Sequence, residues 1–191
     1  GFLNIDNRKM SKSLGNFRTV REISEQYDLQ VLRFFMLNAH YRSPLNFSAE
    51  LMESSRSALE RIQTAVDNLK FLSEHASAQE LTEEETLKVE EAKKFQENFD
   101  EAMDDDFNTA DAVSAIYELV RFSNTEIKAG ASKEFAEKIQ DMLDHLCGVL
   151  GVAEVAEEEV SDEDVAKIEA LIAERTEAKK AKDFAKADAI R

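Results

Sequence analysis

The stretch that decides the fold is residues 132–150, which read SKEFAEKIQDMLDHLCGVL. Its apolar side chains recur at spacings of three and four, at Phe135, Ile139, Met142, Leu143, Leu146 and Leu150. That period places them on one face of a helix, and Ser132 stands where an N-cap is expected. The stretch therefore predicts an amphipathic helix with one buried face.

Three upstream segments repeat this pattern. Their apolar residues fall at Leu51, Ala58, Leu59, Ile62, Ala65, Val66 and Leu69, then at Leu87, Ala92, Phe95, Phe99 and Ala102, then at Ala112, Val113, Ile116, Leu119 and Val120. Ser48 is placed to cap the first, Thr82 with Glu85 forms a capping box before the second, and Gly130 follows the third. Four amphipathic helices with short connections predict an antiparallel bundle in a mainly α protein.

Composition narrows the class of protein. The 191 residues carry a net charge of −16, include one cysteine and three histidines, and contain no apolar run long enough to span a membrane. One cysteine excludes an internal disulfide framework and favours a reducing, cytoplasmic compartment, and no zinc cluster is visible. Residues 1–48 hold seven basic against four acidic residues and residues 174–191 hold six against four, so the middle is strongly acidic. If the chain binds RNA, it therefore does so through its two basic ends or through a few well-placed contacts elsewhere.

The amino-terminal part has different chemistry. Residues 1–5 alternate as a short strand with Phe2 buried, and Lys9-Met10-Ser11-Lys12-Ser13-Leu14-Gly15-Asn16 follows as a polar loop. Two ammonium groups three residues apart, with hydroxyls and backbone N–H groups between them, suit a polyphosphate. Thr19 with Glu22 predicts a capped short helix, and Asp28 caps the next, around residues 31–37, which should be buried nearly all round.

The string Lys-Met-Ser-Lys-Ser at 9–13 resembles the second signature of class I aminoacyl-tRNA synthetases. Together with residues 40–48 (HYRSPLNFS), 103–109 (MDDDFNT) and 182–188 (KDFAKAD), it is similar to cysteinyl-tRNA synthetases along the whole chain. The resemblance implies an enzyme that activates cysteine with ATP and transfers it to tRNA(Cys). It implies that Lys12 is the main catalytic contact to ATP, that Lys9 assists, and that Met10, Ser11 and Ser13 complete the ATP-binding loop, with Gly15 as its hinge.

The same resemblance implies a domain plan. Residues 1–47 would end the catalytic domain, 48–151 would form a DALR-type helical bundle beside tRNA, 152–162 an acidic linker, and 163–191 the truncated start of an anticodon-binding domain. We expect the chain to be a piece of a longer protein whose upstream part holds the first signature and the zinc ligands. ATP would arrive with Mg²⁺, and the isolated piece should neither form cysteinyl adenylate nor bind zinc.

Other singled-out residues have structural explanations. The aspartates 104–106 are interpreted as helix-capping residues rather than as a magnesium site, and Cys147 as a small buried hydrophobe. Arg33 is either a snorkelling or ion-paired arginine or a substrate contact. His40 and Arg42 either face the nucleotide loop or fix the turn before Pro44.

Two rival functions remain open at this point. The first is a paralogous ATP-dependent ligase that joins cysteine to an amino sugar, which also resembles the loop. The basic segment 175–191 argues against it, because such an enzyme needs no anticodon reader. The second is a non-enzymatic helical interaction module whose lysine loop binds an acidic partner.

Overall fold

The computed structural model describes residues 2–153, 162–181 and 183–189. It divides into two compact units, residues 1–155 and residues 156–191. The elements of the first unit run in the order β1 (Leu3–Ile5), β2 (Arg8–Lys9), the 3₁₀ turn η1 (Lys12–Leu14), α1 (Val20–Ser24), α2 (Leu29–Leu37), β3 (Leu45–Phe47), α3 (Ala49–Glu74), α4 (Glu83–Asp104), α5 (Thr109–Glu126) and α6 (Lys133–Leu150). The second unit contains α7 (Asp162–Lys180) and α8 (Phe184–Ala189).

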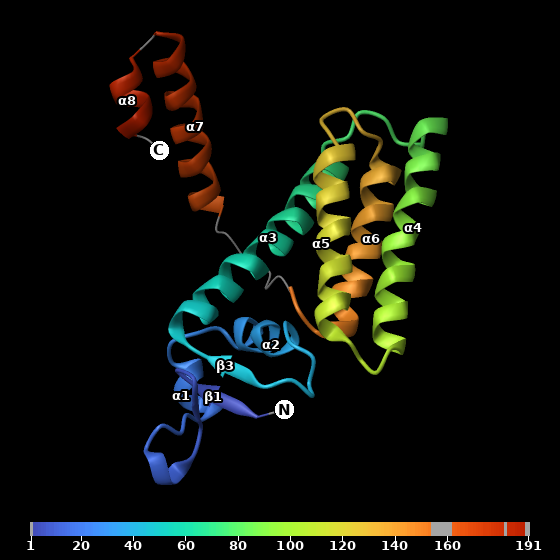
Figure 1. Ribbon diagram of the computed structural model, residues 1–191. Helices are drawn as coiled ribbons and strands as arrows, with labels where there is room; N and C mark the ends of the chain where they lie inside the picture. Colours follow the sequence, from blue (N-terminus) through green and yellow to red (C-terminus); the bar gives the residue numbers. More distant parts are fainter. Residues whose placement is uncertain (1, 154–161, 182, 190–191) are drawn as a thin grey trace. The chain divides into compact units, whose positions relative to one another are not determined.

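Helices α3, α4, α5 and α6 form the expected antiparallel bundle (Figure 1). The caps of α3, α4 and α6 are those that the sequence predicts: Thr82 and Glu85 form a reciprocal capping box, and the hydroxyls of Ser48 and Ser132 accept backbone N–H groups of the first turns. Ile62, Phe99 and most other members of the four stripes are buried in one continuous core. Local pattern is therefore sufficient to build this half of the unit.

Two members of the stripes lie outside the core, contrary to the prediction. Leu51 is 42% exposed and Leu87 is 71% exposed. Each stands one position before a residue of the inward face, Met52 in α3 and Lys88 in α4. One residue is about 100° around a helix, which turns both leucines toward solvent.

The amino-terminal part is a small three-stranded sheet in the order β2-β1-β3, covered by short helices. Strands β1 and β2 are antiparallel and join through Asp6 and Asn7, both with positive φ, as a tight hairpin requires. Strand β3 pairs parallel to β1, with Leu3 opposite Leu45, and sequence patterns did not reveal this pairing. The sheet fixes where the polar loop after β2 begins.

Two burial predictions in this part are wrong. Phe2 was expected in the core but is 69% exposed, because it precedes the first paired residue of β1. Helix α2 is buried on one side only, through Val31, Phe34 and Phe35, whereas Met36 is 48% exposed. The bundle covers one face of α2, and no described element covers the face that carries Leu29 and Met36.

Most of the predicted acidic linker falls in residues 154–161, outside the described residues. Helix α7 lies in the region assigned from the sequence to the start of an anticodon-binding domain, and it ends at Lys180. Asp183 then accepts a hydrogen bond from the backbone N–H of Lys186 at 3.1 Å in the first turn of α8. The Lys186 ammonium reaches Glu174 of α7 at 2.9 Å, which ties the two helices into a hairpin.

Candidate nucleotide loop and the residues around it

The polar loop connects the β hairpin to α1 and presents both of its lysines to solvent. Lys9 is the last residue of β2, and Lys12 is the first residue of η1. Ser11 caps that turn, because its Oγ accepts the Leu14 N–H at 3.3 Å, and it also contacts Ser13 Oγ at 3.1 Å. The two hydroxyls therefore shape the turn from within, while the ammonium groups remain on its surface.

Asn16 closes the loop at its base, a role that sequence analysis did not assign. Its Oδ1 accepts the Ser11 N–H at 2.9 Å, and its Nδ2 donates to the Lys9 carbonyl oxygen at 3.1 Å. One side chain thus bridges the backbone on both sides of Met10. The signal was in the sequence, since an amide can donate and accept at once, but only the fold shows which backbone groups it meets.

Gly15 ends the 3₁₀ turn in the left-handed region, with φ of +66°. Its N–H donates to the Lys12 carbonyl oxygen at 3.2 Å. A Cβ at this position would meet no atom within 4 Å, so the requirement for glycine comes from the backbone conformation and not from lack of space.

Each loop lysine rests over an aromatic ring. Lys9 Nζ lies 5.6 Å from the centroid of Phe2, and Lys12 Nζ lies 5.4 Å from that of Phe17. Exposed contacts of this kind contribute roughly 0.5–1 kcal/mol. A contact of this strength favours one position of each ammonium group in the free loop. It is weaker than a charge-assisted hydrogen bond to phosphate, so it does not prevent the lysine from binding a phosphate group.

Arg33 lies away from this loop and has a structural role. Its Nε donates to the carbonyl oxygen of Leu150, the last residue of α6, at 2.6 Å. This contact is neither the ion pair nor the substrate contact considered from the sequence: the cationic side chain stabilises the negative end of a helix.

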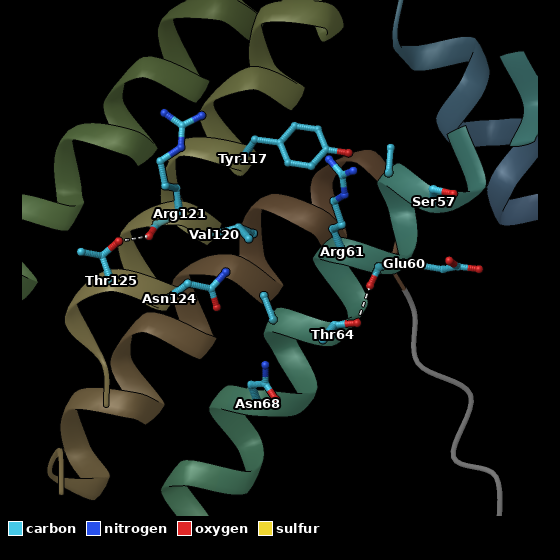
Figure 2. A pocket seen from close by; sticks show the side chains of 12 residues that line it. Ser57, Glu60, Arg61, Thr64, Asn68, Tyr117, Val120, Arg121, Asn124 and Thr125 are labelled. Atoms are coloured by element: carbon cyan, nitrogen blue, oxygen red, sulfur yellow. Dashed lines mark hydrogen bonds between the residues drawn. The ribbon is translucent and has the colours of Figure 1, made fainter. Parts of the chain in front are cut away.

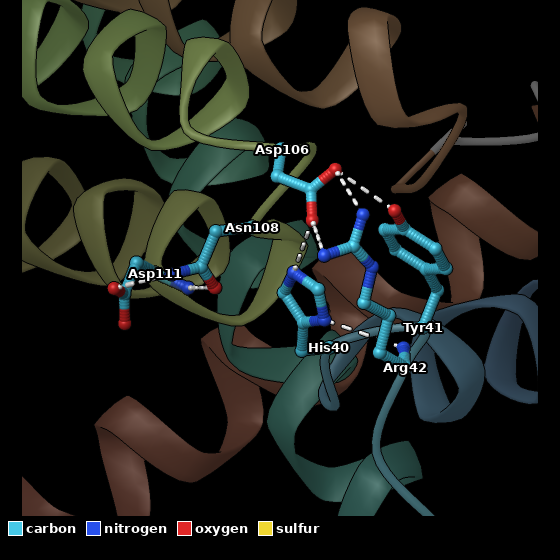
Figure 3. A network of polar contacts seen from close by, with 6 residues as sticks. All are labelled: His40, Tyr41, Arg42, Asp106, Asn108 and Asp111. Carbon is cyan, nitrogen blue, oxygen red and sulfur yellow. Dashed lines mark hydrogen bonds and ion pairs between the residues drawn. The ribbon is translucent and has the colours of Figure 1, made fainter. Parts of the chain in front are cut away.

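The aspartates between α4 and α5 act differently from the prediction (Figure 3). Asn108, and not an aspartate, is the N-cap of α5, since its Oδ1 accepts the Asp111 N–H at 3.3 Å. Asp106 instead faces the segment that precedes β3. It accepts the Tyr41 hydroxyl at 2.8 Å, lies 3.0 Å from Arg42 Nη1, and lies 3.7 Å from His40 Nε2.

His40 Nδ1 accepts the Arg42 N–H at 3.3 Å, which supports a role of these residues in the turn before Pro44. Neither was assigned a partner from sequence, and both contact Asp106, at the turn between two bundle helices. Asp106 and the following Phe107 both have positive φ, which aims the carboxylate back toward the sheet half. The cluster thus joins the loop-bearing half to the bundle, together with a hydrogen bond of 2.8 Å from Thr109 Oγ1 to the Leu37 carbonyl oxygen.

Cys147 is buried in α6, as expected for a small apolar residue, and is 4% exposed. Burial, and to a lesser extent the negative charge of Asp144, raises the pKa of its thiol to about 12. It therefore stays protonated at neutral pH and is no candidate nucleophile. Across the ranges that the structure describes, His, Cys, Asp and Glu side chains form no group that could hold a metal ion.

None of the helices in the described ranges has the length and apolar character of a membrane span. Comparison with known proteins matches two family models. Residues 1–57 match the tRNA synthetases class I (C) catalytic domain, and residues 98–154 match the DALR domain. The first match contains the polar loop, and the second contains α5, α6 and the turn with Asp106.

Curated relatives match over the whole chain. It is 55% identical over 190 residues to a cysteine–tRNA ligase of Lachnospira eligens, and 50% and 47% identical to those of Lachnoclostridium phytofermentans and Clostridioides difficile. In each case 100% of this chain is covered, and it spans 40–41% of the length of these relatives. The predicted resemblance is therefore confirmed.

A solved structure shows the same fold. It is the ternary complex of Agrobacterium radiobacter K84 agnB2 LeuRS with tRNA and LeuAMS, with a TM-score of 0.62 and 20% sequence identity. The similarity covers 82% of this chain and 22% of that one. At this identity the likeness supports the arrangement of helices and sheet, in agreement with the predicted mainly α, class I architecture.

Proposed function

We propose that this chain, which is similar along its whole length to cysteine–tRNA ligases, forms the part of such an enzyme that contacts ATP and tRNA(Cys). The observation that carries the proposal is the combination of this similarity with an exposed, internally braced loop that offers two lysines. The complete reaction joins cysteine to tRNA through cysteinyl adenylate, and this chain would supply the Lys9–Ser13 loop to its first step.

Lys12 acts on ATP through charge. When the carboxylate of cysteine attacks the α-phosphorus, negative charge spreads onto the departing pyrophosphate oxygens. An ammonium group placed there binds the transition state more strongly than bound ATP, and such an interaction lowers the barrier. Lys9 adds a second positive charge, while the backbone and hydroxyl groups of Met10, Ser11 and Ser13 offer donors.

The resting geometry supports a loop that changes position when ATP binds. The lysines leave their phenyl rings at small cost, whereas Asn16 keeps both sides of Met10 together. The loop can thus move as one braced unit instead of unravelling. ATP would arrive with Mg²⁺, and this loop would contribute its positive charges and hydrogen-bond donors to the phosphate oxygens.

The domain plan also remains part of the proposal. Residues 1–47 would belong to the catalytic domain, 48–151 to the helical bundle along tRNA, and 163–191 to the region that meets the anticodon. The family-model matches at 1–57 and 98–154 support the first two assignments. The charge distribution supports the third, because residues 174–191 carry six basic against four acidic residues.

A chimera tests the proposal directly. The 190 matching residues of the Lachnospira eligens cysteine–tRNA ligase are replaced by this chain, and charging of tRNA(Cys) with cysteine is measured beside the parent enzyme. The proposal expects charging within about tenfold of the parent, and no cysteine-dependent ATP–pyrophosphate exchange by the isolated chain.

The same assay separates the rival functions. Cysteinyl adenylate without transfer to tRNA would favour a ligase that uses another acceptor, such as an amino sugar. A folded chimera that forms neither product would contradict the enzymatic proposal and favour a helical interaction module. Circular dichroism of the chimera, compared with that of the parent, shows whether it has folded.

A further inference from the structure

An open groove of about 880 Å³ separates α3 from α5 on the surface of the bundle (Figure 2). The residues that line it are predominantly polar and uncharged or basic. They are Ser57, Ala58, Glu60, Arg61, Thr64, Ala65, Asn68, Tyr117, Val120, Arg121, Asn124 and Thr125. Glu60 is the one acidic residue among them, and Figure 2 shows its carboxylate pointing away from α5. The groove is thus an exception on a strongly acidic bundle.

The two arginines of the groove differ from most basic residues of the bundle. Lysines and arginines between residues 49 and 150 mostly pair with carboxylates of their own helix, as Arg56 does with Glu53 and Lys93 with Glu90. Arg61 on α3 and Arg121 on α5 form no ion pair with any residue that the structure describes. An acidic chain that leaves two guanidinium groups unpaired in one groove has charge available there for an anion.

Tyr117 adds an independent sign of a missing partner. Its hydroxyl oxygen is buried and has no hydrogen-bond partner in the described structure. Burial raises the pKa of this phenol to about 12, and the nearby positive charge of Arg61 opposes the shift, so the group is a donor at neutral pH. Buried donors of this kind are uncommon because they lose hydrogen bonds to water. An oxyanion in the groove reaches this shielded hydroxyl only if the Tyr117 side chain turns outward.

We propose that the α3–α5 groove binds the phosphate backbone of RNA through Arg61 and Arg121. Within the proposed function, on which this identification of the RNA rests, the ligand is a segment of tRNA(Cys). Planar guanidinium groups bind phosphate oxygens through two parallel hydrogen bonds, and the Asn68 and Asn124 amides can donate to the remaining oxygens. The Thr64 and Thr125 hydroxyls already donate to backbone carbonyl oxygens, so they are available only as acceptors, for example from ribose hydroxyls.

The acidic surroundings give this contact a second consequence. The bundle elsewhere repels a polyanion, so RNA that approaches it is favoured only where the groove lies. A few well-placed contacts can then orient the RNA without a broad basic surface. This resolves how a chain of net charge −16 can bind a nucleic acid.

Binding of a tRNA(Cys) transcript to the 191-residue chain tests the groove without requiring catalysis. The variant Arg61→Gln/Arg121→Gln is compared with Lys70→Gln/Lys128→Gln, which removes the same charge from two other unpaired positions outside the groove. We expect about tenfold weaker binding for the arginine variant at 0.1 M salt, a log–log salt slope shallower by roughly 1–2, and little change for the lysine variant.

Three results would overturn the proposal: no RNA binding by the unmodified chain at low salt, equal losses in the two variants, or a loss confined to binding of poly-L-glutamate. The last would assign the groove to an acidic protein partner. In the chimera, the arginine variant should raise KM for tRNA about tenfold and leave cysteine-dependent ATP–pyrophosphate exchange unchanged. A chimera that fails to activate cysteine contradicts the proposed function, whereas the RNA-binding assay still decides the groove.

Discussion

Arg33 and Leu150 are 117 positions apart in the chain, and the Nε of the first donates a 2.6 Å hydrogen bond to the carbonyl oxygen of the second. The contact joins α2, in the loop-bearing half, to the end of the last bundle helix. Gly151 follows in the left-handed conformation, and a Cβ on it would lie 2.9 Å from Arg33 Nη2. The glycine therefore leaves room for the guanidinium group over the carbonyl end of α6, where positive charge is favoured.

Replacement of Arg33 by alanine should lower the free energy of unfolding by about 1–2 kcal/mol, because a charged hydrogen bond and a favourable helix-end interaction are both lost. Urea denaturation of the 191-residue chain measures this. Arg33→Lys keeps the charge without the fixed guanidinium geometry, so it should recover part of the loss. An alanine variant within about 0.3 kcal/mol of the original would contradict the assigned role.

The Asp106 cluster should behave as one coupled unit. Tyr41→Phe removes the donor of the 2.8 Å contact and Asp106→Asn removes the charge of its acceptor, so their destabilisations should fall short of additivity by about 0.5–1.5 kcal/mol in a double-mutant cycle. Asp105→Asn is the matched control, because this neighbouring aspartate contributes its backbone to the end of α4. Additive effects of Asp106→Asn and Tyr41→Phe would show that the contact does not couple the two halves.

Gly15→Ala should impair the loop without damaging the core. A non-glycine residue with φ near +66° costs about 1–2 kcal/mol, and 1.4 kcal/mol corresponds to a tenfold loss of the native loop conformation. Adenylate formation by the chimera should therefore fall about tenfold. Gly148→Ala is the control: it lies in α6 with open space around it, so it should leave the rate unchanged and stabilise the helix. Equal rates for the two variants would contradict this account.

Glu85 should make stability depend on acidity. Burial alone raises the pKa of this carboxyl group, but hydrogen bonds from Thr82 and Ser132 outweigh burial and hold the pKa below its usual value of 4.5. A carboxylate with a lowered pKa in the fold stabilises it above the unfolded value, and the contribution disappears as pH falls through the folded pKa. Between pH 6 and pH 3, the midpoint temperature of thermal unfolding should therefore fall less steeply for Glu85→Gln than for the original chain. Glu83→Gln is the control and should follow the original.

Sequence predicted those parts of the fold that depend on neighbours in the chain. The capping boxes at Thr19 and Thr82 and the helix that begins after Ser132 are confirmed, because a cap and a period of 3.6 involve residues within one or two turns. The loop at 9–16 was also recognised, since its chemistry is contained in eight consecutive residues.

Contacts between distant segments were out of reach. The parallel pairing of β1 with β3, the partner of Arg33 and the cluster around Asp106 each join residues 40 or more positions apart. Periodicity also failed where an apolar residue stands beside the buried face, as at Leu51 and Leu87, because one step of 100° decides burial. The groove at Arg61 and Arg121 was missed because it exists only where two helices that are distant in sequence, α3 and α5, lie together.

The central claim is that Lys12 stabilises the departing pyrophosphate, and single-turnover formation of cysteinyl adenylate by the chimera tests it most directly. Lys12→Ala should slow this step by about 10²–10³-fold, a loss on the order of 3 kcal/mol of transition-state stabilisation. Lys128→Ala, which removes an exposed ammonium group outside the loop, should leave the step unchanged. A Lys12→Ala chimera that forms cysteinyl adenylate as fast as the Lys128→Ala chimera would contradict the account.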